Sequence, residues 1–246
     1  MKIYIDAGHG GTDSGAVQRT TGRREATDNL RLAQLLQRRL DDMGFKTMMA
    51  RTGDYNKTVK QRTDEANKWG ADLYISLHRN DFAPNRVQDT SANGFETFIQ
   101  INDRKGSKLF QQAIHSRLRT VGLVSAPNLA SNAIPATQIR DRGEKTGNYH
   151  VTRESNMPAV LVETGFIGNT KDNGLYDRNL AGFDTAICQA IVDILGKPVQ
   201  PPTPPQSDVM YRVVAESHKL KSNADNTLAD LRRLGFRSPF IVEFKQ

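Results

Sequence analysis

The sequence predicts an α/β fold: a twisted, mostly parallel sheet flanked by helices, followed by a small C-terminal βαβ module. Three observations support this class. Short apolar and β-branched runs alternate with stretches of helical periodicity over residues 1–196, as in proteins whose helices connect parallel strands. A proline-rich segment at 197–208 marks a linker. One further strand–helix–strand pattern then occupies residues 209–246.

Five strands are expected before the linker, because each is a short run rich in apolar and β-branched residues. They are Lys2–Asp6, Lys46–Ala50, Asp72–Leu77, Phe95–Ile101 and Ala159–Glu163. Between the first two, apolar residues recur at helical spacing from Leu30 to Met43, and Gly44 ends that helix. Further helices are expected at Lys57–Trp69, Ser107–Val121 and Leu180–Leu195, each followed directly by glycine.

The linker holds five of the ten prolines of the chain, a composition that favours extended polyproline II structure without a core. In the module beyond it, Met210–Glu216 and Pro239–Phe244 are strand-like and Asn226–Leu234 is helical. A unit this small buries little apolar surface by itself. We therefore expect the module to pair with a second copy or to pack on a neighbour.

The composition is that of a globular protein with a basic surface. Lysine and arginine (34) outnumber aspartate and glutamate (27), and the net charge of +7 attracts polyanions such as an acidic wall polymer. We expect no nucleic acid partner, because the basic residues form no block and aromatic residues make up only 7% of the chain. We expect no membrane span, because no apolar run approaches the roughly 18 to 20 residues required. The single cysteine, Cys188, excludes an internal disulfide.

Three chemically active side chains are predicted to meet at one rim of the sheet. His9 comes just after the first strand, His78 follows the third, and Glu163 closes the last. The carboxyl ends of parallel strands share one edge of a sheet, and ligands bind there. Two imidazoles and one carboxylate suit Zn²⁺ with one position left open for water. The residues by themselves leave several carboxylates as candidates: Asp6, Asp13, Glu25 and Glu163.

Five blocks of the chain, in this order, resemble the zinc-dependent N-acetylmuramoyl-L-alanine amidases. They are IDAGHGGTDSGA, the helix-start Glu25, RTGDYNKTVKQRTDEAN, YISLHRND and PAVLVETGFIGN. The resemblance covers residues 1–196 and implies that His9, Glu25 and His78 are the zinc ligands. It also implies that Glu163 is the general base and later the general acid. The bond cut would be the amide between the lactyl group of N-acetylmuramic acid and L-alanine in peptidoglycan.

Three further residues are expected near the substrate. Arg79 stands where the family usually has a small residue, and it would either contact a stem-peptide carboxylate in the groove or face solvent. Asn80 would hydrogen-bond the substrate or a neighbouring site residue. Arg153 would form an ion pair that shapes the site. By contrast, His115 lies in the middle of a predicted helix among polar residues and is expected to be solvated.

The C-terminal module resembles half of a SPOR-type peptidoglycan-binding domain, with the turn LGF between its helix and its second strand. The full domain is built from two such units, so we expect a homodimer in which two halves complete a wall-binding module. Met210 is the first residue of the first predicted strand of the module. An internal translation start there would instead supply the missing half as a free peptide.

These features fit two biological settings. The residues MKIYIDAGHGG contain no signal-peptide core, so we expect the protein to be cytoplasmic until release and then to attack peptidoglycan. The basic charge favours a Gram-positive wall. A phage endolysin is the preferred interpretation, and a mother-cell autolysin used in sporulation is the alternative. Two other functions stay open: a zinc peptidase acting on stem peptides, and a wall-binding protein without catalysis.

Overall fold

The computed structural model describes residues 1–81, 92–103, 105–121 and 139–195, together with five residues near the end of the chain. The chain separates into two compact units, Met1–Pro202 and Thr203–Gln246. In the second unit the five described residues are helical: Lys221, Ala224, Asp225, Thr227 and Leu228. The predicted linker at 197–208 and the two strands of the predicted C-terminal module lie outside the described residues, so they stay predictions.

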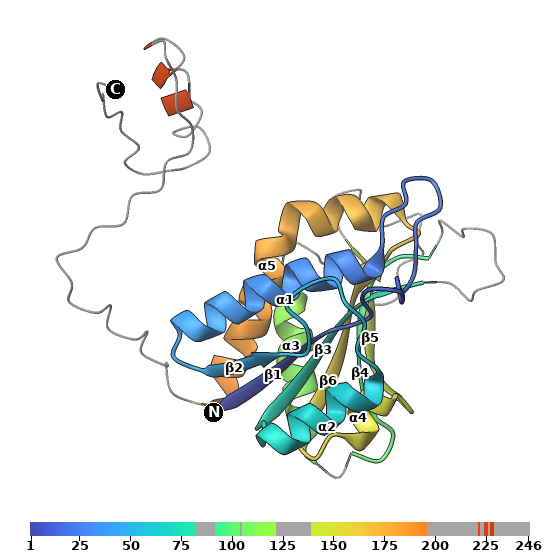
Figure 1. Cartoon of the computed structure of the whole chain (residues 1–246), viewed down its shortest axis with the longest axis vertical. Helices are drawn as coiled ribbons and strands as arrows, with labels where there is room; N and C mark the ends of the chain where they lie inside the picture. The colour runs from blue at the N-terminus through green and yellow to red at the C-terminus, as the bar shows by residue number, and fades with distance from the viewer. Residues whose placement is uncertain are drawn as a thin grey trace. The chain divides into compact units, whose positions relative to one another are not determined.

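The first unit is built on a six-stranded sheet (Figure 1). Its strands are β1 (Lys2–Ala7), β2 (Lys46–Met49), β3 (Leu73–Asn80), β4 (Phe95–Gln100), β5 (Asp141–Gly147) and β6 (Ala159–Phe166). They lie side by side in the order β2-β1-β3-β6-β4-β5, and every adjacent pair is parallel except β4 with β6. The predicted fold class, a mostly parallel sheet flanked by helices, is confirmed.

Two sets of helices cover the two faces of this sheet (Figure 1). One face carries α1 (Glu25–Asp42), α3 (Ser107–Leu118) and α5 (Thr170–Leu195), and the other carries α2 (Val59–Trp69) and α4 (His150–Glu154). Strand side chains alternate between two apolar clusters, as a period of two requires: Ile3 and Ile5 join the first, and Tyr4 joins the second. None of the helices in the described part is long and apolar enough to span a bilayer.

Strand β5 was not expected, because its sequence DRGEKTG has no apolar alternation. It lies at one edge of the sheet beside β4, where a polar strand can face water. Helix α5 begins at Thr170, well before the expected Leu180, and Asn179 within it departs from helical geometry (φ −117°, ψ 18°). This break interrupts the helical periodicity on which the sequence prediction depended.

Strands β3 and β6 are both longer than predicted. β3 continues to Asn80 and β6 to Phe166, so His78 lies inside β3 rather than after it, and Glu163 lies inside β6 rather than at its end. The two residues are direct partners in the parallel register of these strands. The pairing therefore places both side chains at the same level of the sheet, near its carboxyl edge.

Candidate metal centre

The loop that carries His9 lies very close to strand β3. A Cβ atom on Gly8 would lie 2.3 Å from Cε1 of His78, so only glycine fits between the two strands. His9 itself has a φ of +61°, a left-handed conformation that side chains other than glycine seldom adopt. Such a backbone persists only where the surrounding structure holds it in place.

Two buried arginines hold this loop. Arg51 donates from Nε to the carbonyl oxygen of Ala7 (2.9 Å) and from Nη2 to that of Gly8 (3.0 Å). Arg62 donates from Nη1 to Ala7 (2.7 Å) and from Nη2 to the carbonyl oxygen of His9 (2.8 Å). Sequence reasoning did not assign either arginine a role. Their position inside the family block RTGDYNKTVKQRTDEAN was the available signal.

His9, Glu25 and His78 form one cluster. Each offers a ligand atom, and these atoms lie within 4.8 Å of one another. Glu25 Oε1 lies 2.9 Å from Nδ1 of His78, and Oε2 lies 3.3 Å from Nε2 of His9. The structure thus brings together the three residues predicted as ligands. Glu25 reaches the cluster from the first turn of α1, where the helix dipole favours a carboxylate.

The electrostatics of the cluster fit a divalent cation. Burial raises the pKa of Glu25, but the hydrogen bonds and charges of His78 and His9 lower it well below its ordinary value. Burial lowers the pKa of His9, but Glu25 and Asp13 raise it by a larger amount, so its pKa is about 9. In the metal-free protein His9 therefore carries a proton in the place where a metal ion would carry positive charge. Two nitrogens and one ionised carboxylate form a donor set that suits zinc.

Asp13 orients the ring of His9. Its Oδ2 lies 2.9 Å from Nδ1 of His9, while Nε2 of the same ring faces Glu25. A carboxylate on the far nitrogen of a ligating histidine fixes its tautomer and makes it a stronger ligand. Asp13, one of the four carboxylates left open by the sequence, thus lies behind the cluster. Asp6 is also placed behind it, in a buried ion pair with Arg62 (2.5 Å).

Glu163 lies beside the cluster with an unsatisfied oxygen. Its Oε2 is buried and has no hydrogen-bond partner among the described residues. Burial, together with the negative charges of Glu25 and Glu96, raises the pKa of Glu163 well above its ordinary value. A buried carboxyl group without a partner is costly in a purely structural role. Its position next to His78 suits proton transfer instead.

Asn80 is part of a polar group around Glu96. Its Nδ2 donates to Oε1 of Glu96, whose Oε2 accepts from Nε of Arg142 (2.9 Å) and from Nζ of Lys145. Glu96 is the cross-strand partner of Glu163 in the antiparallel pairing of β4 with β6. Asn80 therefore reaches a carboxylate next to Glu163. Its predicted contact with substrate stays a prediction.

Both positions expected for Arg79 are wrong. The residue is only 1% exposed, and its guanidinium donates to Asp28 Oδ2 and to Asn173 Oδ1, each at 2.7 Å. It also lies over the ring of Tyr176, with 4.3 Å between Cζ and the ring centroid. The register shifts between His78 and Asn80, and the side chain of Arg79 is buried with residues of α1 and α5. A guanidinium used in this way is not available to a stem-peptide carboxylate.

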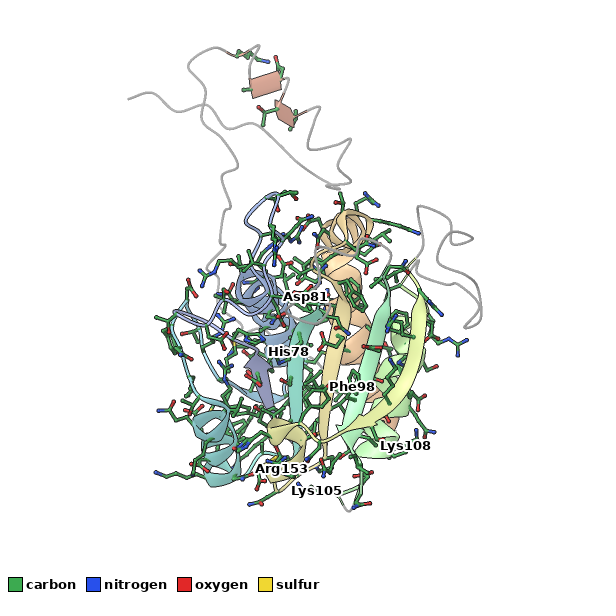
Figure 2. The ribbon with its side chains drawn as sticks, turned by 90° about the vertical axis from the view of Figure 1, so that its right-hand side faces the viewer. His78, Asp81, Phe98, Lys105, Lys108 and Arg153 are labelled. Carbon is green, nitrogen blue, oxygen red and sulfur yellow. The ribbon has the colours of Figure 1, made fainter. Side chains whose placement is uncertain are left out.

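Arg153 does form an ion pair, but with its neighbour Glu154 (2.6 Å), and it also donates to Asn148. Figure 2 shows Arg153 beside Lys105, well removed from His78. A cavity of about 330 Å³ opens beside His9 and His78, and Arg153 is not among its lining residues. Among the described residues, no contact of Arg153 with the site supports its predicted role in shaping it.

The expectation that His115 is solvated is wrong. The side chain is buried, with Nε2 at 2.8 Å from Oδ1 of Asp141 and Nδ1 at 3.1 Å from Oγ1 of Thr97. Asp141 begins β5, the strand that the sequence pattern did not predict. Without that strand, the partner of His115 could not be identified.

The comparison with known proteins agrees with the cluster and its fold. Residues 3–193 match the sequence profile of the N-acetylmuramoyl-L-alanine amidases. The chain belongs to this family. The sporulation-specific N-acetylmuramoyl-L-alanine amidase of Bacillus subtilis (strain 168) is 32% identical to this amidase over 245 residues, which cover 99% of this chain and 85% of the relative.

Solved structures of the family share the architecture. The N-acetylmuramoyl-L-alanine amidase from Clostridium difficile 630 superposes with a TM-score of 0.68 at 29% identity, covering 80% of this chain and 97% of the other. The catalytic domain of CwlV from Bacillus (Paenibacillus) polymyxa var. colistinus does so with a TM-score of 0.65 at 32% identity, covering 79% and 98%. The amidase described here therefore acts on the N-acetylmuramoyl-L-alanine amide of peptidoglycan.

Proposed function

We propose that this amidase works with a single zinc ion held by His9, Glu25 and His78, and that Glu163 moves the proton of the reaction. Bound zinc would polarise the lactyl carbonyl group and lower the pKa of water at the open coordination position. The observation that carries the proposal is the cluster itself, whose ligand atoms lie within 4.8 Å of one another. Beside it, one oxygen of Glu163 has no hydrogen-bond partner in the part of the chain that the structure describes.

Glu163 has the properties of a group that both accepts and donates a proton. As the water oxygen bonds to the lactyl carbonyl carbon, Glu163 accepts the proton of that water. It then gives the proton to the nitrogen of L-alanine as the carbon–nitrogen bond breaks. Burial and the neighbouring negative charges raise its pKa well above its ordinary value, so its carboxylate is a stronger base than an exposed one.

Replacement of Glu163 by glutamine tests this role. The Glu163→Gln variant should keep its fold and its zinc but lose activity on purified peptidoglycan by about 10²- to 10⁴-fold, because proton transfer contributes that much. The measurement is the rate at which new amino-terminal alanine appears. Glu154→Gln is a matched control, since Glu154 is exposed and pairs only with Arg153 in the described structure. Full activity of Glu163→Gln would refute the assignment.

Product analysis separates the amidase from a zinc peptidase. Glycan ending in free lactyl groups, together with stem peptides whose cross-links are intact, is the expected product mixture. Cut cross-links with the lactyl amide intact would indicate the peptidase. A wall-binding protein without catalysis would release neither product.

For the biological setting, we propose lysis of the mother-cell wall during sporulation. The relative named as sporulation-specific aligns with 99% of this chain, including the segment after the linker. The endolysin interpretation rests on sequence features that the sporulation setting explains equally well. The time at which the bacterium produces the protein distinguishes the sporulation setting from the phage setting. Production during sporulation supports the proposal, and production only upon phage induction contradicts it.

A further inference from the structure

The cavity beside the metal centre has no role in the chemistry described so far. It has a volume of about 330 Å³, near the lower end of the range for small-ligand pockets. His9, His78 and Leu161 of β6 are among the residues that line it. Val59, the first residue of α2, and Tyr149, just before α4, line it too. Any group that occupies the cavity is therefore next to two of the three residues of the cluster.

Tyr149 is a rigid aromatic side chain at the rim of this cavity. Its ring packs edge-on against Phe98, with 5.1 Å between centroids and 71° between planes. It also covers Gly147, where a Cβ atom would lie 2.5 Å from the ring, so a larger residue would push the ring away. Phe98 is labelled in Figure 2, on the same side of the sheet as His78. The ring is thus held by packing while the residue stays 39% exposed.

The phenol of Tyr149 has no hydrogen-bond partner among the described residues. Burial and the negative charges of Glu163 and Glu96 raise its pKa. Phe98, against which the ring packs, lies on β4, the strand that pairs with β6 at Glu163. Tyr149 therefore connects the cavity with the reacting end of the site.

The permanently charged cations that line the cavity are already used within the protein. Lys57 donates from Nζ to Ala50 O (3.0 Å) and pairs with Glu65 (2.6 Å). Arg62 pairs with Asp6 and binds the loop of His9. The rest of the lining includes the ring of Tyr149, the methyl groups of Val59, the neutral amide of Asn56, Thr58, His150 and the exposed carboxylate of Asp13, which disfavours a negatively charged ligand. A sugar with an acetamido group fits such a lining better than a carboxylate does.

The polar group around Glu96, on the strand next to Glu163, differs in charge from the cavity. There Arg142 and Lys145 share the single carboxylate of Glu96, so one positive charge is left over. Stem peptides carry free carboxylates, which favour a positive surface. The group around Glu96 therefore suits the peptide half of the substrate, whereas the cavity suits its sugar half.

We infer that the cavity between α2 and α4 holds the N-acetylmuramoyl sugar, that Tyr149 is the platform for its ring, and that the stem peptide extends past Glu163 towards Arg142 and Lys145. This inference rests on the proposed function, because it concerns the substrate of the same site. It assigns Tyr149 as a specificity residue for the sugar rather than for the amide.

Two soluble substrates with the same scissile amide test the inference. One is an N-acetylmuramoyl-peptide, and the other is the D-lactoyl-peptide of the same sequence, which lacks the sugar. The zinc-loaded full chain should prefer the first in kcat/KM. Tyr149→Ala should lower kcat/KM for the sugar-bearing substrate roughly tenfold, mainly through KM, and leave the lactoyl substrate within about twofold. Tyr149→Phe keeps the ring and should retain most of the preference.

Tyr55→Ala is the matched control, because Tyr55 is 47% exposed and does not line the cavity. It should leave the preference unchanged. Equal losses on both substrates in Tyr149→Ala would overturn the inference, as would a wild-type protein that does not distinguish the two substrates. Failure of the proposed function has a different signature: Glu163→Gln would then stay active on both substrates.

Discussion

At the scale of single residues, the site depends on charges placed in pairs. Asp6 is buried in the core, where it accepts hydrogen bonds from Arg62, Ser76 and Tyr74. Burial raises the pKa of Asp6, but the charge of Arg62 and the hydrogen bonds from Arg62 and Ser76 lower it below its ordinary value. Because Arg62 also holds the carbonyl group of His9, this buried pair connects the stability of the core with the geometry of the cluster.

Replacement of Asp6 by asparagine should therefore lower the free energy of unfolding of the metal-free protein by about 3–5 kcal/mol near neutral pH, since it leaves Arg62 buried without its partner. The pH dependence has a definite sign. A lowered pKa gives stability that is complete above the unfolded value of about 3.9 and is lost as the pH falls through the folded value. Urea unfolding should show the gap between wild type and Asp6→Asn narrowing below about pH 4, by up to ~1.4 kcal/mol per pH unit. A constant gap would contradict this account.

If the cluster holds zinc as proposed, His9 should make zinc binding depend on pH. Its pKa of about 9 means that the metal-free protein holds a proton there at neutral pH, and zinc must displace it. Protein stripped with a chelator should be inactive and should release about one proton per zinc bound near neutral pH. Apparent affinity should rise with pH and level off near the pKa of His9. Calorimetry in buffers of different ionisation enthalpy measures the proton count, and zinc uptake without proton release would contradict the charge assigned to His9.

At the scale of elements, the close approach of β1 and β3 decides where His78 lies. Gly8 has no positive φ, so alanine is compatible with its backbone, but the added Cβ would lie 2.3 Å from the His78 ring. The ring would have to move away from Glu25. A similar logic applies to the bulge after His78, which directs Arg79 into the core and Asn80 towards Glu96.

The Gly8→Ala variant should therefore bind zinc about 10- to 100-fold more weakly, the size of effect seen when a ligand loses its supporting contacts. Competition with a chromophoric chelator measures this. Gly53→Ala is a suitable control, because its Cβ would meet nothing closer than 3.6 Å. Equal zinc affinity in the two variants would show that the contact between the strands does not position His78.

At the scale of the whole molecule, we expect two chains to form a dimer through their C-terminal segments. A module of residues 209–246 is too small to bury a core by itself, so two copies should complete it. Light scattering after gel filtration should therefore give a dimer for the full chain and a monomer for a chain ending at residue 196. A monomeric full chain at micromolar concentration would count against pairing through this segment.

The sequence by itself was sufficient to predict which histidines meet at the carboxyl ends of the strands. Apolar runs locate the strands, and chain direction in a parallel sheet sends their carboxyl ends to one edge, so the meeting of His9 and His78 followed from local patterns. Glu25 could not be chosen among four carboxylates on that basis, and the family resemblance singled it out. The roles of these residues as ligands, and of Glu163 as base, stay predictions for the experiments above.

Only the tertiary structure decided what the charged and aromatic side chains touch. Arg79 meets Asp28 and Asn173, which lie 51 and 94 positions away in the chain. His115 meets Asp141 on a polar edge strand that carries no periodic signal. Tyr149 is held by packing against Phe98 and over Gly147. Hydrophobic periodicity is a local property of the chain, whereas the partner of a buried charge depends on which distant segments pack together.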